Sequence, residues 1–346
     1  MSITRPPIAY SFILHDKIEE MKNLNVGMIG AGGIAKKLAA TIEKLDGFTN
    51  YAIASRSLDK ATAFKNDNYF TKAYGSYEEL MEDENVDLVY IATPHSEHHR
   101  NMLLALKHHK PVLDEKAFTT NAIEAKDIIA RFEKENLFLT EAIWTRYMPS
   151  RKIIDDIIKE NLIGKISLLE ANLCYPNKSH ARLNDPNLAG GALLDMGIYP
   201  LTFALMALGS YPDKVEATCL KSETGVDETT FMRLSFPSNV EAILYTSMDV
   251  SSDRTGYIYG DNGYIKVFNI NNPEAIEVHA KDQSLVKRVE IKEDVNGYEY
   301  ELYACKKALE EGELECPEIP HSDIIKVMEL LDEIRRKIDL RYPFER

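Results

Sequence analysis

The strongest constraint on this chain is a glycine-rich turn, Gly30-Ala31-Gly32-Gly33-Ile34-Ala35, which follows a short apolar run. Glycine suits positions where a strand turns sharply into a helix and where a ligand approaches the backbone closely. We expect Gly30 to make the turn and the N-terminus of the following helix to bind an anion. The motif predicts a dinucleotide site with contacts from Gly30, Gly32, Gly33 and Ile34. A plain strand-to-helix turn is the alternative interpretation of the same residues.

The first half of the chain alternates short β-rich apolar runs with segments of helical spacing. Ser76 with Glu79, and Asn121 with Glu124, have the spacing of capping boxes and predict helix starts. Such alternation predicts an α/β Rossmann domain with a parallel sheet over residues 21–141, preceded by an extension over residues 1–20. The expected strands are Val26–Ile29, Tyr51–Ala54, Lys72–Tyr74, Leu88–Ala92, Val112–Asp114 and Phe138–Thr140.

After Trp144 the pattern changes to one dominated by strands. Asp261-Asn262-Gly263 predicts a hairpin turn because Asn and Gly tolerate a positive φ. We predict a second, α+β domain over residues 142–346 with a large, mostly antiparallel sheet. Its expected strands are Ile166–Leu173, Val215–Leu220, Thr229–Phe236, Val240–Met248, Gly256–Tyr259 and Tyr264–Phe268, and its expected helices are Arg151–Glu160, Gly191–Leu208, Tyr298–Glu310 and Ser322–Ile338.

Composition excludes several classes of protein. The 346 residues include 55 acidic and 41 basic ones, a formal charge of −14 that would repel nucleic acid. The four cysteines form no CxxC pair, so neither a zinc ribbon nor a disulfide framework is expected, and a reducing cytoplasm fits. The longest apolar stretch, Ala192–Leu208, contains Asp195 and is shorter than a membrane span requires. No signal peptide is predicted at the N-terminus.

The end of the second expected strand discriminates between cofactors. An acidic residue there is typical of NAD sites, whereas arginine accommodates the 2′-phosphate of NADP. This chain has Ser55-Arg56-Ser57 at that position. We therefore favour NADP, bound by Ser55 and Arg56, with NAD as the other candidate. A solvated surface arginine with no cofactor role is the alternative.

Three further strings carry a resemblance to a known family. They are Thr93-Pro94 with His98, Glu115-Lys116, and Asp195-Met196-Gly197-Ile198-Tyr199. Together with the glycine turn they resemble the Gfo/Idh/MocA oxidoreductase family, and Glu141–Arg146, Gly190–Asp195 and Glu223–Asp227 are similar to its branch of dihydrodiol and xylose dehydrogenases. The resemblance implies cofactor contacts from Thr93, Pro94, His98, Glu115 and Lys116. The family usually has proline at Ala117, and much of it has histidine at Tyr199.

Oxidation of a hydroxyl carbon requires a base for the hydroxyl proton and a group that holds the oxygen. The resemblance implies that Lys116 and Tyr199 are these catalytic groups, and that Asp195 orients the substrate or the lysine. We expect a nearby Lys116 ammonium to favour ionised Tyr199 and so lower its pKa. From the residues alone, Lys116 also fits a surface lysine, and Asp195 with Tyr199 fits a loop-capping acid beside a core tyrosine.

The predicted substrate is a sugar or a vicinal diol. By resemblance Trp144 forms one side of its cleft and Arg182 contacts it, although a core tryptophan and a surface arginine fit equally well. His95, His98 and His99 lack companion ligands, so we expect no metal site. The alternative functions are an NAD-dependent glycosidase that recycles its cofactor and a non-catalytic dinucleotide sensor.

Strand Val240–Met248 has apolar residues on both faces, which a one-sided sheet would not need. We therefore expect a second subunit to cover the outer face, as the resemblance also implies. The predicted assembly is a homodimer or a dimer of dimers, with no nucleic acid and no membrane as partners.

Overall fold

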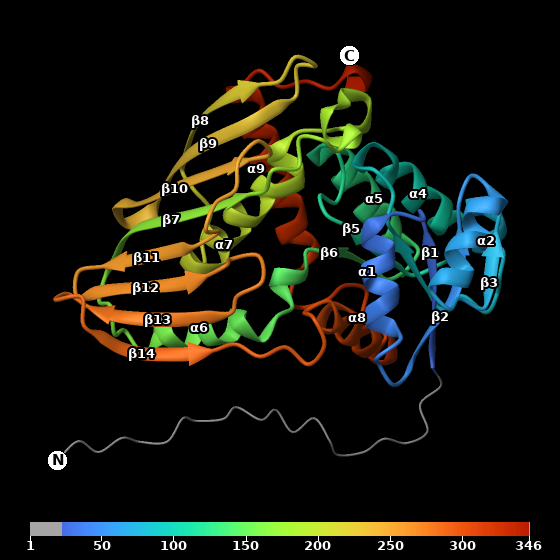
Figure 1. Ribbon diagram of the computed structural model, residues 1–346, viewed down its shortest axis with the longest axis horizontal. Coiled ribbons are helices and arrows are strands. Elements are labelled where there is room, and N and C mark those ends of the chain that lie inside the picture. Colours follow the sequence, from blue (N-terminus) through green and yellow to red (C-terminus); the bar gives the residue numbers. More distant parts are fainter. Residues whose placement is uncertain (1–22, 346) are drawn as a thin grey trace.

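The computed structural model describes residues 23–345, so the predicted extension over residues 1–20 lies outside the described residues. Two lobes, each built on its own sheet, make up the described chain (Figure 1). The six-stranded and eight-stranded sheets confirm the predicted class, a Rossmann fold followed by an α+β lobe.

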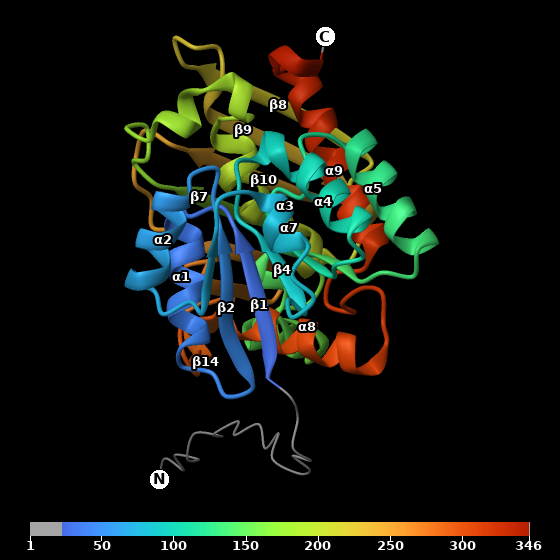
Figure 2. The same cartoon turned by 90° about the vertical axis from the view of Figure 1, so that its right-hand side faces the viewer.

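The first lobe contains a parallel sheet of strand order β3-β2-β1-β4-β5-β6. Helices cover it, and Figure 2 views this lobe with β1 and β2 in front. The order reverses between β1 and β4, the switch point where open α/β sheets bind ligands. The strands are β1 Leu24–Ile29, β2 Phe48–Ala54, β3 Lys72–Tyr74, β4 Leu88–Ile91, β5 Val112–Glu115 and β6 Leu139–Ala142. The helices are α1 Gly33–Ile42, α2 Leu58–Asp67, α3 Tyr77–Met81, α4 His95–Lys107 and α5 Ala122–Lys134.

Burial explains why these runs form strands. All residues of β4, β5 and β6 are buried, as expected for a parallel sheet covered on both faces. Both predicted helix starts are confirmed, because Ser76 Oγ accepts from Glu79 N at 3.2 Å and Asn121 Oδ1 accepts from Glu124 N at 3.0 Å. The predicted starts of these two helices in the Rossmann lobe are therefore correct.

The second lobe contains a sheet of order β14-β13-β12-β11-β7-β10-β9-β8, in which only β10 and β7 pair in parallel. The strands are β7 Ile166–Cys174, β8 Lys214–Lys221, β9 Asp227–Phe236, β10 Val240–Ser247, β11 Gly256–Gly260, β12 Gly263–Phe268, β13 Ala275–Ala280 and β14 Leu285–Glu290. Strands β13 and β14 were not among the strands expected from the sequence. The exposed, charged edge strand β14 lacks the apolar alternation that identifies a half-buried strand.

Helices lie on the inner side of this sheet and between the lobes (Figure 1). They are α6 Pro149–Lys159, α7 Ile198–Leu208, α8 Glu299–Glu311 and α9 His321–Lys337, and short turns are η1 Trp144–Arg146, η2 Ala181–Asn184, η3 Pro186–Leu188, η4 Leu193–Gly197, η5 Pro237–Asn239 and η6 Pro343–Glu345. Helix α9 packs against α5 of the first lobe. The C-terminal part of the chain thus joins the two lobes.

One helical stretch of the described residues, Pro186–Leu208, is long and apolar enough to cross a membrane, contrary to our expectation for this region. It combines η3, η4 and α7, and 83% of the most apolar window is buried inside the protein. Its apolar character therefore fits a core helix beneath the large sheet.

Candidate active site

The glycine turn has the geometry of a phosphate-binding loop. Gly30 has φ +98°, and a Cβ there would lie 2.5 Å from the Ala92 carbonyl oxygen. A Cβ on Gly32 or Gly33 would meet no atom within 4 Å, which leaves open space in front of the α1 N-terminus. The first turn of α1 contains no acidic residue that would compete with an anionic ligand. These residues fit a pyrophosphate.

The end of β2 presents a cation beside this turn. Ser55 is buried and Arg56 is exposed. Ser57 caps α2, because its hydroxyl accepts from Lys60 N at 3.4 Å. Arg56 forms no ion pair within the described part of the chain, so its guanidinium is available to a phosphate.

Lys116, Asp195 and Tyr199 come together at the junction of the lobes. Lys116 directly follows β5, and its Nζ donates to the Asp195 carbonyl oxygen at 2.5 Å and lies 3.4 Å from Oδ1. The same nitrogen is 5.2 Å from the centre of the Tyr199 ring. The structure therefore unites three residues that are separated in the sequence.

A π-helical turn, η4, shapes this contact. Asp195 lies within η4, and Tyr199 lies in the first turn of α7. Pro200 stands five residues after Asp195 and has no N–H, so it cannot supply the i+5 hydrogen bond of a π-helical turn to the Asp195 carbonyl. Lys116 supplies a hydrogen bond to that carbonyl instead.

Cations keep Asp195 ionised. Burial alone would raise its pKa, but Lys116 and Arg182 hold the pKa of this carboxyl well below its usual range. Arg182 Nη2 donates to Asp195 Oδ1 at 2.9 Å. Arg182, predicted to contact the substrate, thus contacts Asp195, and its side chain stays 40% exposed.

Our expectation that the pKa of Tyr199 is lowered was wrong, because the pKa is raised. Burial, reinforced by Tyr298 and the carboxylate of Glu115, raises the pKa of Tyr199 well above 10. The Lys116 ammonium lies over the ring face and does not outweigh this burial. Within the described residues the Tyr199 hydroxyl makes no hydrogen bond, so it is a protonated group available to a ligand.

The other predicted cofactor residues lie along the carboxyl edge of the parallel sheet. Thr93 Oγ1 accepts from Asn101 Nδ2 at 3.0 Å, and Pro94 caps α4. Glu115 accepts a short hydrogen bond from the buried Tyr90 hydroxyl, and burial raises the pKa of this carboxyl. The contact of Thr93, Pro94 and Glu115 with a cofactor stays a prediction.

His98, expected to be a polar neighbour of the cofactor, is completely buried. Its Nε2 lies 2.8 Å from the Thr93 carbonyl oxygen and its Nδ1 lies 3.1 Å from Asp114 Oδ2. The ring therefore contacts the backbone of the Thr93 loop, and its own contact with a cofactor stays a prediction. His99 pairs with Asp127 at 3.0 Å, and no group of metal-ligating side chains was found among residues 23–345.

His95 makes the stability of the fold pH-dependent. Burial, aided by Arg182, lowers the pKa of His95 to about 3. The unfolded chain binds this proton near pH 6.5, so stability falls as the pH drops from 6.5 toward 3, by about 1.4 kcal/mol per pH unit. In urea titrations from pH 6.5 to 4.5, His95→Asn should reduce this slope and the exposed His109→Asn should not. Equal slopes in both variants would contradict the assignment.

Trp144 does not face an open cleft. It is 6% exposed, its ring stacks on Tyr298 at 4.2 Å, and its Nε1 donates to Asn271 Oδ1 at 3.1 Å. The alternative of a core tryptophan at the lobe junction describes it better. Tyr298, which was not among the expected site residues, is partly exposed and close enough to raise the pKa of Tyr199. Its sequence signal was weak, because Tyr298 is one of several tyrosines at a predicted helix start, with Tyr300 and Tyr303 close by.

The two lobes and this site define a class of protein, the two-domain oxidoreductases that bind NAD or NADP on a Rossmann fold. Residues 24–142 match the model of the oxidoreductase family with an NAD-binding Rossmann fold, Gfo/Idh/MocA, and residues 152–266 match the C-terminal domain of that family. The chain is 32% identical over 327 residues to trans-1,2-dihydrobenzene-1,2-diol dehydrogenase of Mus musculus, a match that covers 92% of this chain and 98% of the relative. The chain belongs to the Gfo/Idh/MocA family.

Two further comparisons agree with this placement. D-xylose 1-dehydrogenase (NADP(+)) of Hypocrea jecorina is 34% identical over 365 residues, covering 92% of this chain and 93% of that protein. The structure of a 3-ketoreductase from Actinomadura kijaniata in complex with NADP superposes with a TM-score of 0.85 at 24% identity, covering 92% and 98% of the two chains. At that identity the ketoreductase supports the fold alone.

Proposed function

We propose that this chain is an NADP-dependent oxidoreductase that acts on a hydroxyl carbon of a sugar or a vicinal diol. The observation that carries the proposal is the contact of Lys116 with Asp195 and Tyr199 at the same sheet edge as the open glycine turn. The relatives named for a dihydrodiol and for D-xylose support the substrate class. Contacts from Gly30, Gly32, Gly33, Ile34, Ser55 and Arg56 would hold the cofactor.

The residues of the chain handle the proton and the oxygen. A bound nicotinamide supplies or accepts the hydride. In reduction, the protonated Tyr199 hydroxyl donates its proton to the carbonyl oxygen, and the Lys116 ammonium stabilises the developing negative charge there. In oxidation the steps are reversed, and the ionised form of Tyr199 accepts the hydroxyl proton. Asp195 holds Lys116 in place through its carbonyl and carboxylate oxygens.

The test of this function is direct. Purified protein is mixed with NADP and a panel of aldoses and vicinal diols, and the absorbance of reduced cofactor is followed. Sugar-dependent reduction of NADP supports the proposal. Turnover of a glycoside without net NADPH would favour the glycosidase, and tight cofactor binding with no turnover on any compound would favour the sensor.

Arg56 should determine the choice of cofactor. Removing a guanidinium from a phosphate costs about 1.5–3 kcal/mol, so Arg56→Ala should weaken NADPH binding roughly tenfold to hundredfold and leave NADH binding nearly unchanged. Fluorescence titration with each reduced cofactor measures both affinities. The exposed Lys60→Ala is the matched control. A wild-type preference for NADH would overturn the assignment.

We also propose a homodimer or dimer of dimers formed through the outer face of the eight-stranded sheet. Phe231, Ile243 and Leu168 on that face are 46%, 41% and 36% exposed. Tyr257 stacks on Tyr259 nearby, with ring centres 5.6 Å apart. Burial of this apolar surface would favour association. Light scattering at micromolar concentration should give at least twice the monomer mass, and a monomeric mass would reject the dimer.

The domain boundary and the compartment also belong to the proposal. We place the end of the Rossmann domain at residue 141, directly before the end of β6, and the second domain over residues 142–346. Cytoplasmic location is supported by four cysteines that are all free thiols.

A further inference from the structure

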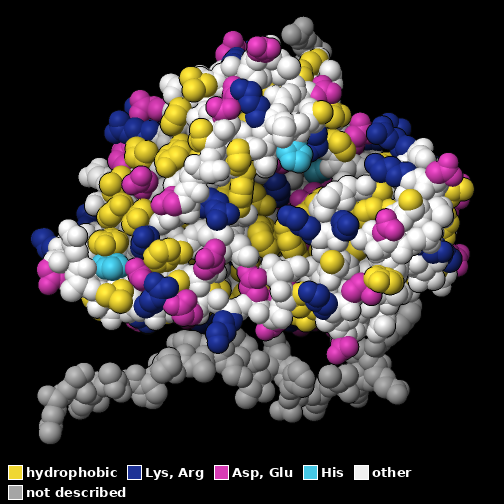
Figure 3. Space-filling model, viewed as in Figure 1, with side chains coloured by type: hydrophobic (Ala, Val, Ile, Leu, Met, Phe, Trp, Pro, Cys, Tyr) yellow, Lys and Arg dark blue, Asp and Glu magenta, His cyan; other side chains and the backbone are white. Residues whose placement is uncertain are grey.

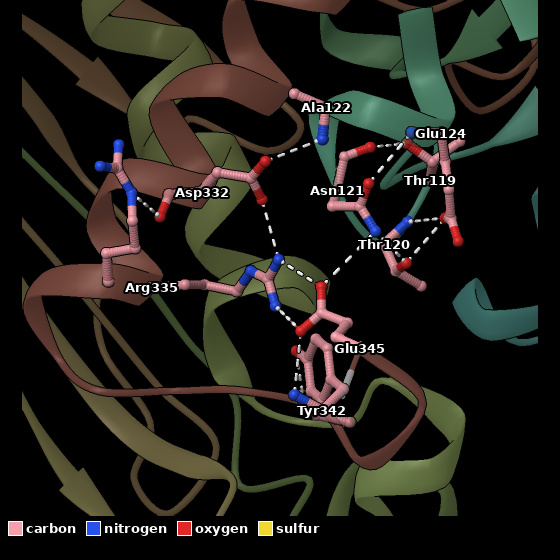
Figure 4. Close-up of polar contacts among 11 residues, drawn as sticks. Thr119, Thr120, Asn121, Ala122, Glu124, Asp332, Arg335, Tyr342 and Glu345 are labelled. Atoms are coloured by element: carbon pink, nitrogen blue, oxygen red, sulfur yellow. Dashed lines mark hydrogen bonds and ion pairs between the residues drawn. The ribbon is translucent and has the colours of Figure 1, made fainter. Parts of the chain in front are cut away.

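The C-terminal tail, residues 338–345, is folded back onto α9 by one arginine (Figure 4). Arg335 Nη1 and Nη2 donate to the two carboxylate oxygens of Glu345 at 2.8 Å each, and Nη2 also donates to Asp332 Oδ1 at 2.8 Å. The side chains of Arg335 and Glu345 are only 6% and 18% exposed. A bidentate pair this well shielded holds the tail in one geometry.

The carboxylates of Asp332 and Glu345 in this cluster also bind the end of the loop that carries Lys116. This loop runs directly into α5, whose first residue is Ala122. Asp332 Oδ2 accepts from Ala122 N at 2.9 Å, and Glu345 Oε1 accepts from the helix cap Asn121 at 3.5 Å. The carboxylates of the second lobe therefore complete the start of a helix in the first lobe, as Figure 4 shows.

The tail also holds the segment that leads to Asp195. The completely buried Tyr342 donates its hydroxyl to the Gly190 carbonyl oxygen at 3.1 Å. The next residue, Gly191, donates its N–H to the Leu183 carbonyl oxygen at 2.9 Å. A Cβ on Gly190 would lie 2.5 Å from that same oxygen, so the two backbone segments approach closely there and only glycine fits. Leu183 follows Arg182, the partner of Asp195.

We propose that the C-terminal tail positions the catalytic pair, with the Tyr342 hydroxyl as the group that sets the Asp195 segment against the Lys116 loop. The tail contacts both segments and neither reacting side chain, so Tyr342 is a positioning residue. The inference rests on the proposed function for its kinetic test. Its physical basis is that a misplacement of about 1 Å at a reacting centre can lower the rate about a hundredfold.

The test compares three variants of the full chain. Tyr342→Phe removes one hydroxyl and keeps the ring beneath Arg335, and Glu345→Gln weakens the tail clamp without touching Gly190. Arg341→Ala is the matched control, because Arg341 is exposed in the same tail and makes no hydrogen bond or ion pair with the described residues. Each variant is assayed for kcat across pH, for NADPH affinity and for thermal unfolding.

We expect Tyr342→Phe to lower kcat at least tenfold and to change its pH profile, with NADPH affinity within twofold of the wild type. Glu345→Gln should also lower kcat and change its pH profile. This variant provides the test if Tyr342→Phe fails to fold. A lower melting temperature with kcat and pH profile within twofold of the wild type in the folded variants would overturn the inference.

A second readout separates this inference from the proposed function. The carboxyl pKa of Asp195, followed by ¹³C NMR and assigned with Asp195→Asn, depends on its distance from Lys116. Tyr342→Phe should raise this pKa toward the usual value for aspartate, and an unchanged pKa would overturn the inference. If the wild type turns over no sugar or diol, the proposed function fails, and the carboxyl titration still decides the role of Tyr342.

Discussion

Lys116→Met is expected to lower kcat/KM for the sugar or diol by about 10³-fold or more, while NADPH affinity changes only a few-fold. General acid–base groups contribute 10²–10⁴ in rate, and this substitution also removes the ammonium from the reacting oxygen, a loss of about 4 kcal/mol or more. Methionine keeps the length of the side chain but cannot donate to the Asp195 carbonyl. Steady-state kinetics and cofactor fluorescence measure the two effects.

The control for this variant is Lys134→Met, which removes an exposed lysine from the last turn of α5. It should leave both quantities unchanged. A Lys116→Met enzyme that retained activity within tenfold of the wild type would exclude Lys116 from the chemistry. A large loss of cofactor affinity would instead make Lys116 a binding residue for the dinucleotide.

Tyr199→Phe is expected to lower kcat by about 10²-fold or more with almost no effect on the melting temperature. The hydroxyl makes no hydrogen bond within the described residues, so its removal leaves no partner unsatisfied in the fold. The raised pKa of Tyr199 keeps the proton in place below pH 10, so reduction by the wild type should not lose rate to ionisation of this group between pH 6 and 9.

Two measurements check the role of Tyr199. The exposed Tyr69→Phe, with 75% of the residue accessible, should behave as the wild type in both rate and stability. The double variant with Lys116→Met should cost little more than Lys116→Met alone, because groups that act as a unit are not additive. Losses that multiplied in the double variant would show that the two residues act independently.

Much of the first lobe was predictable because its signals are local. The glycine turn, the apolar strands and the caps at Ser76 and Asn121 each depend on residues close in sequence. In the second lobe, prediction succeeded for strands that alternate and for the hairpin turn at Asp261–Asn262, where Gly260 pairs with Gly263. It failed for β13, although Ile276 and Val278 alternate there with polar residues, and for β14, whose exposed, charged sequence lacks that alternation.

The candidate site shows the same division. Resemblance named Lys116, Asp195 and Tyr199, but the expected direction of the Tyr199 pKa shift was wrong, and the substrate contact expected of Trp144 stays a prediction. Trp144 is covered by Tyr298, and burial raises the pKa of Tyr199 where the lysine was expected to lower it. Whether a side chain is covered, and by what, depends on residues far along the chain.

The sequence by itself determined the Rossmann class, the α+β second lobe and the residue types at the site, because motif spacing and periodicity act over a few residues. Only the tertiary structure decided that Lys116 binds the carbonyl of Asp195, that Tyr298 stacks on Trp144, and that Tyr342 ties the tail to Gly190. These contacts join residues tens to hundreds of positions apart. Their free energy depends on distance and burial, which arise only when both lobes pack together.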